Sequence, residues 1–287
     1  MQIFRDVDTI KTYLQEHRQN GNKIGFVPTM GTLHQGHLSL IQESTNDCDV
    51  TVCSVYVNPT QFNNAKDLET YPRQESEDLE KLKAAGCDAV FLPSNEVIYP
   101  NGMNTDHLLK FDFGILERQL EGEKRPGHFN GVGIVVSKLF HIVQPDNAYF
   151  GQKDLQQYLI VRKMVQDLSF GIKVKGCPTI READGLAMSS RNLRLSEADR
   201  KVAPLLYQVI SKVKDDIQAG VSVKEALENG EASLGADSAF TLEYLAVRET
   251  SRLLPIEKVE QGSDFAVLVA AHLGGVRLID NILVEHN

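Results

Sequence analysis

Apolar runs and helical patterns alternate along the first 178 residues, which predicts a mostly parallel sheet flanked by helices. Short apolar runs typical of strands lie at 23–29, 49–57, 89–92, 148–150 and 172–177. The run at 49–57 (DVTVCSVYV) is too apolar for a strand with one wet face, so we place it centrally in the sheet. Helical patterns lie between these runs, at about 33–44, 75–85, 132–143 and 154–168.

The pattern changes after Pro178. Ser196 is a candidate N-cap for one long helix that ends near Ala219. A second helix is predicted at about 223–234, and strand-like runs follow at 241–247, 265–271 and 277–284. We therefore predict an α/β domain over residues 1–178 and a smaller α+β domain over residues 179–287.

The composition and charge of the 287 residues exclude several classes of protein. Hydrophobic side chains make up 42% and charged ones 24%, which is typical of a soluble globular chain and not of a disordered or fibrous one. The net charge of −9 argues against a general binder of nucleic acid or membrane surfaces, although it leaves room for a local basic pocket.

The first residues contain no apolar stretch of signal-peptide length, and no window approaches the ~18 apolar residues of a membrane span, so we expect a cytoplasmic protein. The four cysteines form no CxxC pair, which suggests neither a disulfide framework nor a zinc site.

The stretch PTMGTLHQGH (28–37) carries the clearest chemistry. It lies where a strand passes into a helix, and the carboxyl ends of parallel strands border the ligand in such folds. A helix start offers unpaired N–H groups and a positive dipole end to phosphate. His34 and His37 are three residues apart, so they share one face of the helix and can reach the same anion. With its two glycines, the stretch resembles the nucleotide-binding signature of the HxGH nucleotidyltransferase superfamily.

Four further motifs accompany this stretch. They are NPTQF (58–62), RPGHFNGV (125–132), FGQKDLQQ (150–157) and MSSRN (188–192). Each has an ordinary structural interpretation when it is taken alone: a turn, a polar surface loop, an N-cap and a helix-capping turn, respectively. Taken together they can serve a nucleotide, because Lys153, Ser190 and Arg191 can all donate hydrogen bonds to phosphate oxygens.

In this order and spacing, and with RLIDN at 277–281, the five motifs resemble the pantoate–β-alanine ligase family, also called the pantothenate synthetases, over essentially the whole chain. The resemblance implies an ATP-dependent ligase that condenses pantoate with β-alanine through a pantoyl-adenylate and releases AMP and pyrophosphate. It further implies a Rossmann-like amino-terminal domain (1–178), a smaller carboxy-terminal lid domain (179–287), dependence on Mg²⁺ and a homodimer.

The same resemblance assigns roles to residues. The catalytic set would be His34, His37, Lys153, Ser189, Ser190 and Arg191, with His37 as the general acid or proton donor. The ATP-binding set would be Met30, Gly31, Thr32, Leu33, His34, Gln35, Gly36, His37, Gly151, Gln152, Lys153, Asp154, Ile180, Met188, Ser189, Ser190 and Arg191. Gln61 would bind pantoate and also β-alanine, and Gln157 would bind pantoate. The magnesium ligands stay unknown: Glu77, Asp78 and Asp154 are candidates, but the first two lie at a helix start, where acidic residues are expected in any case.

The chemistry of amide formation suits these residue types. A carboxylate is a poor acyl donor, so such an enzyme first makes it attack the α-phosphorus of ATP. Because an acyl-adenylate hydrolyses in water, we expect the segment 188–192 to move with the second domain and close over the phosphates. Two alternatives stay open: a nucleotidyltransferase that joins a nucleotide to an alcohol or a phosphate, and a catalytically silent nucleotide sensor. AMP release that depends on β-alanine separates the ligase from the first, and the effect of His37→Ala separates it from the second.

Overall fold

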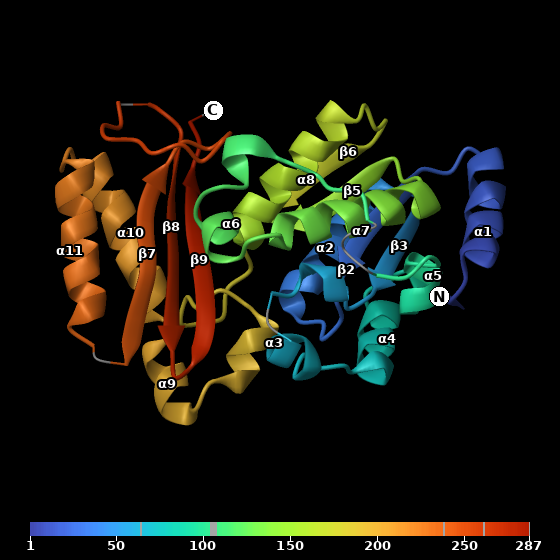
Figure 1. Cartoon of the computed structure of the whole chain (residues 1–287), viewed down its shortest axis with the longest axis horizontal. Coiled ribbons are helices and arrows are strands. Elements are labelled where there is room, and N and C mark those ends of the chain that lie inside the picture. Colours follow the sequence, from blue (N-terminus) through green and yellow to red (C-terminus); the bar gives the residue numbers. More distant parts are fainter. Residues whose placement is uncertain (64, 104–107, 238, 261, 287) are drawn as a thin grey trace. The chain divides into compact units, whose positions relative to one another are not determined.

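The apolar runs of the first 178 residues form one parallel sheet in the computed structural model (Figure 1), which describes residues 1–63, 65–103, 108–237, 239–260 and 262–286. The strands are β1 (Gln2–Phe4), β2 (Ile24–Thr29), β3 (Val50–Val55), β4 (Ala89–Phe91), β5 (Asn147–Gly151) and β6 (Lys173–Cys177). Their order is β1-β4-β3-β2-β5-β6, and every pairing is parallel. The α/β class and the internal position of β3 are therefore confirmed, whereas β1, at three residues, was too short to be predicted from its pattern.

Helices cover both faces of this sheet. The helices in this part of the chain are α1 (Val7–Gln19), α2 (Gln35–Asp47), α3 (Ala65–Glu69), α4 (Glu75–Ala84), α5 (Asn95–Ile98), α6 (Glu121–Lys124), α7 (His128–Val143) and α8 (Leu155–Asp167). Helix α2 packs on β2, β3 and β5, and α7 packs on β2 and against α1. Since crossover connections between parallel strands are right-handed, α2 and α7 lie on opposite faces. Among the described residues, no helix combines the length and the apolar character needed to cross a membrane.

Helix α7 begins four residues earlier than its pattern predicted. Gly127, at φ +80°, is its N-cap, and His128 is already helical. The expectation of a loop over the whole RPGHFNGV motif was therefore wrong, because the second half of this motif forms the first turn of α7. A glycine in the left-handed region lets the chain turn sharply into the helix, which the apolar pattern of the following residues does not reveal.

Between strands β2 and β5 the order in which the chain adds strands to the sheet reverses. From β2 the chain passes through α2 to β3 on one side, and from β5 it passes through α8 to β6 on the other. Open α/β sheets bind their ligands between the carboxyl ends of two such strands. The HxGH stretch follows β2, and Gly151 ends β5, so the topology brings these two predicted segments to the same edge of the sheet.

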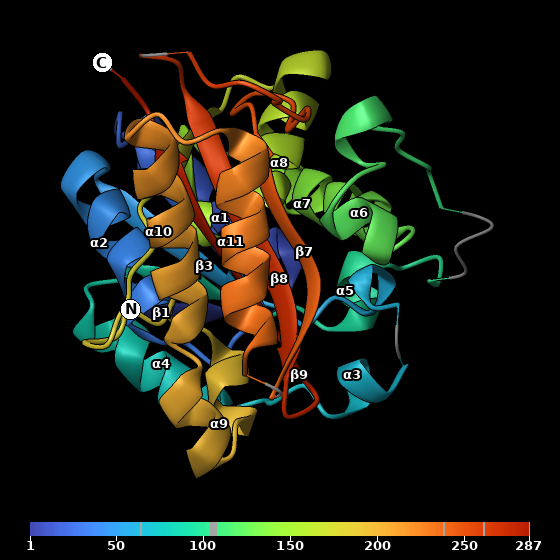
Figure 2. The same cartoon turned by 90° about the vertical axis from the view of Figure 1, so that its left-hand side faces the viewer.

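The second half of the chain forms an antiparallel sheet in the order β7 (Phe240–Arg248), β8 (Phe265–Leu273) and β9 (Val276–Val284). The helices are α9 (Glu197–Val202), α10 (Leu205–Gln218) and α11 (Val223–Gly235), and Figure 2 shows α10 and α11 side by side over one face of the sheet. Ser196 caps α9 as predicted, since its hydroxyl oxygen accepts from Asp199 N at 3.1 Å. The single long helix expected here was wrong: it is broken between α9 and α10 at Pro204, which has no N–H to donate to a helix.

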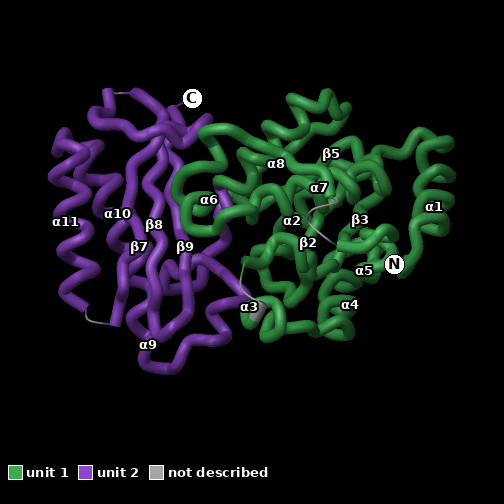
Figure 3. The backbone as a smooth tube through the Cα atoms, in the orientation of Figure 1, with its two compact units in different colours: residues 1–152, 156–178 green, residues 153–155, 179–287 purple. Residues whose placement is uncertain are grey.

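The chain divides into two compact units, which Figure 3 colours separately. The first consists of Met1–Gln152 and Gln156–Pro178, and the second of Lys153–Leu155 and Thr179–Asn287. The short segment Lys153–Leu155 thus belongs to the second unit although its chain neighbours belong to the first. That residues 1–178 and 179–287 are separate domains, and that the second acts as a lid, stay predictions.

Three of the four cysteines are buried thiols. Cys53, Cys87 and Cys177 are buried, and Cys48 is partly buried. Burial raises the pKa of Cys87 to about 12 and that of Cys177 to about 11, so both are protonated at neutral pH. These thiols are therefore packing residues of the first unit.

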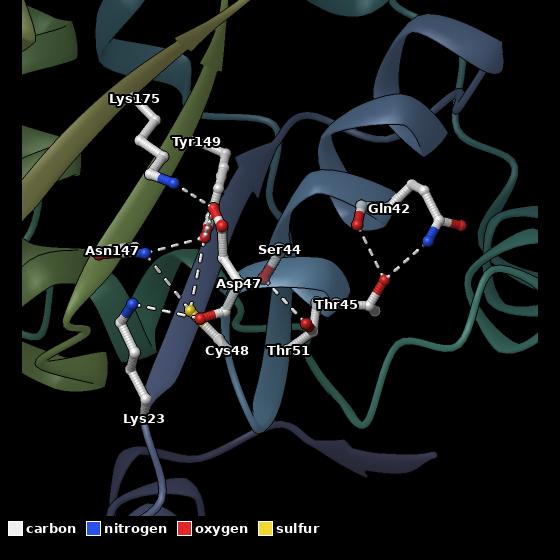
Figure 4. A network of polar contacts seen from close by, with 10 residues as sticks. All are labelled: Lys23, Gln42, Ser44, Thr45, Asp47, Cys48, Thr51, Asn147, Tyr149 and Lys175. Atoms are coloured by element: carbon white, nitrogen blue, oxygen red, sulfur yellow. Dashed lines mark hydrogen bonds and ion pairs between the residues drawn. The ribbon is translucent and has the colours of Figure 1, made fainter.

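A polar network ties the end of α2 to Tyr149 on β5 and to Lys175, its paired residue on β6 (Figure 4). The Asp47 carboxylate accepts from the buried Tyr149 hydroxyl at 2.9 Å and from the Lys175 ammonium. Cys48 Sγ lies 3.4 Å from the same hydroxyl. The network lies at the edge of the sheet opposite to the HxGH stretch, so we assign it to stability.

This network gives a pH-dependent prediction. The hydrogen bonds from Lys175 and Tyr149 lower the pKa of Asp47 from its ordinary value of 3.8. A carboxyl with a lower pKa in the folded chain stabilises the fold above that ordinary value, and the contribution is lost as the pH falls through the folded pKa. Asp47→Asn should therefore lower the free energy of unfolding by about 1–2 kcal/mol at neutral pH, with a smaller difference near pH ~3.5. Urea denaturation at both pH values measures this. The exposed Glu43→Gln on the same helix is the control, and a difference that stays constant with pH contradicts the prediction.

Candidate functional site

The turn after β2 has a conformation that few sequences can adopt. Gly31 and Thr32 both have positive φ, at +82° and +54°. A Cβ on Gly31 would lie 3.0 Å from both Asp78 Oδ2 and Val55 Cγ1, in addition to the backbone strain. The glycine is therefore required by the turn, and the non-glycine residue that follows it needs outside support to stay left-handed.

Helix α4 supplies that support. Asp78 is only 1% exposed, and its two carboxylate oxygens accept from Thr32 N at 2.8 Å and Leu33 N at 2.7 Å. One turn later, Lys81 Nζ donates to Leu33 O at 2.9 Å. The sequence had suggested Asp78 as a metal ligand and missed this structural role. The signal was present, because Asp78 lies one helical turn before the buried Leu82 and so shares its inward face.

His34 and His37 form a capping box at the start of α2. His34 is the N-cap, and its Nδ1 accepts from Gly36 N at 3.1 Å. His37 reaches back, so that its Nδ1 accepts from His34 N at 3.4 Å. The ring centroids are 4.1 Å apart. The expectation that the two rings share one face of the helix start is confirmed.

This arrangement fixes the tautomer of both rings. A neutral imidazole carries one hydrogen, and a ring nitrogen that accepts from a backbone N–H cannot hold it. With both Nδ1 atoms accepting, Nε2 is the N–H donor in each ring. The start of α2 therefore combines two imidazole donors with the positive end of the helix dipole, which is an arrangement suited to an anion.

The NPTQF and RPGHFNGV motifs meet beside Met30. Gln61 is 8% exposed, its Nε2 lies 3.0 Å from Met30 Sδ, and its Oε1 accepts from Asn58 Nδ2 at 3.1 Å. His128 Nδ1 lies 2.8 Å from Gln61 O. A Cβ on Gly131 would approach Thr60 O to 2.3 Å, so only glycine lets α7 come this close. His128 and Gly131 position the Gln61 segment, a role that the sequence did not indicate.

The two adjacent glutamines at the start of α8 differ in burial. Gln156 is 3% exposed and bonds to backbone, accepting from Glu121 N at 3.0 Å and donating to Leu116 O and Gln119 O at 2.7 and 2.8 Å. Gln157, the predicted pantoate ligand, is partly exposed. The buried glutamine thus holds the segment 116–121, and the choice of Gln157 as a binding residue stays a prediction.

The second unit contains the predicted nucleotide-binding residues Lys153, Asp154, Ile180 and 188–191, whereas Gly151 and Gln152 lie in the first. Lys153 lies in a 3₁₀ turn with its side chain 16% exposed, and its Nζ is 3.9 Å from Asp154 Oδ1. Ile180 O accepts from Met188 N at 3.0 Å, which brings these two residues together. Ser189 caps the 3₁₀ helix Ser190–Arg194, and its Oγ accepts from Arg191 N at 3.2 Å. The ordinary interpretation of MSSRN as a capping turn therefore describes Ser189, whose hydroxyl hydrogen can still be donated.

The described residues contain no cluster of three or more His, Cys, Asp or Glu side chains that could hold a metal ion. Both oxygens of Asp78 already bind backbone N–H groups, and Glu77 is an exposed residue 3.8 Å from Lys81. Asp154 has a side chain that is 51% exposed. Mg²⁺ often uses one or two carboxylates plus substrate phosphates and water, so a single carboxylate fits this ion better than an all-protein cage does.

Comparisons with known proteins agree on one family. A family model described as pantoate-beta-alanine ligase matches residues 2–283. A pantothenate synthetase from Cytophaga hutchinsonii is 43% identical over 97% of both chains. The crystal structure of the pantothenate synthetase from Thermus thermophilus superposes with a TM-score of 0.91 at 43% identity, covering 99% of this chain and 100% of that one. A pantoate-beta-alanine ligase from Francisella tularensis, solved with beta-gamma ATP and beta-alanine, has a TM-score of 0.81 at 35% identity and covers 99% of this chain and 97% of that one.

Proposed function

Because this chain belongs to the pantoate–β-alanine ligase family, a family of AMP-forming ligases that make pantothenate, we propose that it works through a pantoyl-adenylate. In the first step the pantoate carboxylate attacks the α-phosphorus of ATP, and pyrophosphate leaves. In the second step the neutral amine of β-alanine attacks the acyl carbon, AMP leaves, and the amine loses a proton to solvent.

The observation that supports this most directly is the capping box at the start of α2. Its two Nε2 donors can contact phosphate oxygens, whose negative charge increases as pyrophosphate departs. His37 would be the proton donor to these oxygens, with His34 beside it. The remainder of Met30–His37, together with Gly151 and Gln152, would bind ATP through the backbone at the edge where β2 and β5 end.

The further assignments rest on the motifs. Gln61 would bind pantoate and β-alanine, and Gln157 would bind pantoate. Donors to the ATP phosphates would be Lys153, Ser189, Ser190 and Arg191, with Ile180 and Met188 as packing or backbone contacts. Magnesium would be held by Asp154 and the phosphates, where it would neutralise part of their charge. The homodimer and the cytoplasmic location stay predictions.

Two assays test the proposed function. With ATP, pantoate and labelled pyrophosphate, label should enter ATP without β-alanine, because the adenylate forms reversibly. AMP should accumulate at high rate only when β-alanine is added. Rapid pyrophosphate release to another acceptor, without any need for β-alanine, would favour the nucleotidyltransferase alternative, and nucleotide binding with no exchange at all would favour the sensor.

A further inference from the structure

The RLIDN motif on β9 has no role in the reaction proposed above. Its last two residues, Asp280 and Asn281, are 4% and 5% exposed, which is unusual for neighbouring polar residues on one strand. Successive side chains of a strand point to opposite faces, so these two side chains contact different parts of the structure. Each makes hydrogen bonds to a segment that carries predicted phosphate donors.

Asn281 bonds to the backbone of Lys153. Its Nδ2 donates to Lys153 O at 2.8 Å. Lys153 lies in the short segment 153–155 that belongs to the second unit, while residues 152 and 156 belong to the first. A lysine side chain has four rotatable bonds, so the place that its ammonium reaches depends on where its backbone is held. The Asn281 side chain fixes that backbone at its carbonyl.

Asp280 acts on the other segment through Arg181. The two side chains form a bidentate pair, with Nη1–Oδ2 at 2.6 Å and Nη2–Oδ1 at 3.0 Å. Arg181 also donates to Gly185 O at 3.1 Å, and its guanidinium lies 3.8 Å from the centroid of the Tyr207 ring. Burial raises the pKa of Asp280, while Arg181 opposes this rise.

Arg181 belongs to a hairpin that ends in the MSSRN motif. It pairs antiparallel with Ala187, and Met188 N donates to Ile180 O at 3.0 Å. Asn192, in the 3₁₀ helix that follows, donates from Nδ2 to Ala187 O at 3.0 Å. Fixing Arg181 therefore fixes the base from which the segment 188–192 extends.

We propose that Asp280 and Asn281 are positioning residues for adenylate formation: neighbours on β9, they hold Lys153 and the hairpin before Ser190 and Arg191 in one fixed relation. This inference rests on the proposed function. Phosphoryl transfer depends on the placement of donors, and a displacement of ~1 Å can cost about 10²-fold in rate. A rigid strand that anchors both segments keeps their donors in register.

A double-mutant cycle tests the proposal. Asn281→Ala should lower kcat of pantoate-dependent ATP–pyrophosphate exchange about tenfold with little change in KM for pantoate, because Gln61 and Gln157 stay in place. In the Lys153→Ala background the same substitution should lower kcat by less than about twofold, because the side chain that it positions is gone. Arg181→Lys keeps the charge but loses the bidentate pairing, and its effect should multiply with that of Asn281→Ala.

The exposed Asn229→Ala on α11 is the matched control and should leave exchange unchanged. If Asn281→Ala does not fold, Asn281→Ser, which loses less volume, replaces it in the cycle. The proposal is overturned if Asn281→Ala lowers kcat by the same factor with Lys153 present as with Lys153→Ala. It is also overturned if Asn281→Ala has the exchange activity of the wild type. Absence of exchange in the unmodified enzyme instead overturns the proposed function, so the two failures are distinct.

Discussion

Replacing His37 by Asn is expected to lower kcat of pantoate-dependent ATP–pyrophosphate exchange by about 10²–10³-fold, the usual cost of one missing transition-state donor. Asn places its side-chain oxygen near the position of Nδ1, so it can still accept from His34 N, as His37 does at 3.4 Å. It has no donor where Nε2 lies. The capping box and the stability of the fold should therefore survive, with the free energy of unfolding changed by less than ~0.5 kcal/mol.

His37→Gln is the matched variant. Its longer side chain carries an N–H₂ near the position of Nε2, so exchange should fall only about tenfold, well short of the loss in His37→Asn. Exchange assays at saturating ATP and pantoate, together with thermal unfolding of all three proteins, separate the two roles of the ring. If Asn keeps near-normal exchange, or if both variants lose stability in proportion to activity, His37 is a structural cap and not a donor to phosphate.

The predictions that succeeded depended on patterns local in sequence. The β-branched run at 49–57 identified an internal strand, because only a strand covered on both faces can be apolar throughout. The three-residue spacing of His34 and His37 placed both rings on one face because the helix repeat dictates it. Ser196 was recognisable as a cap from its neighbours alone.

The features that were missed depend on residues distant in sequence or on backbone conformation. Asp78 supports a turn 46 residues earlier, and His128 contacts the Gln61 carbonyl 67 residues away. The spacing of apolar and polar residues along the chain does not reveal contacts between residues so far apart in the sequence. Gly127 shifted the start of α7, and Pro204 divided a predicted helix whose apolar spacing continues on both sides. Pro204 was visible in the sequence, and its missing N–H should have outweighed the pattern.

Asp78→Asn should lower exchange activity by about 10–100-fold and the free energy of unfolding by about 2–3 kcal/mol. The substitution keeps the size of the side chain but replaces one of its two acceptors by an N–H₂ donor. That donor would face Thr32 N or Leu33 N, which now bond to the carboxylate at 2.8 and 2.7 Å, and at 1% exposure water cannot compensate. Thr32 would lose part of the support for its left-handed backbone, and the capping box two residues later would be less well placed.

Glu77→Gln is the control, because Glu77 precedes Asp78 on α4 but is exposed and lies 3.8 Å from Lys81. It should change stability by less than ~0.5 kcal/mol and leave exchange unaltered. A magnesium titration distinguishes the support that Asp78 gives to the turn at Thr32 and Leu33 from the metal-binding role that the sequence also allowed. Activity of Asp78→Asn should stay low at every Mg²⁺ concentration, since a distorted turn is not repaired by metal, whereas a lost ligand would be compensated by excess ion. Recovery of Asp78→Asn at high Mg²⁺, or an equal loss in Glu77→Gln, would assign the pair to metal binding and remove the argument that Asp78 acts through the turn.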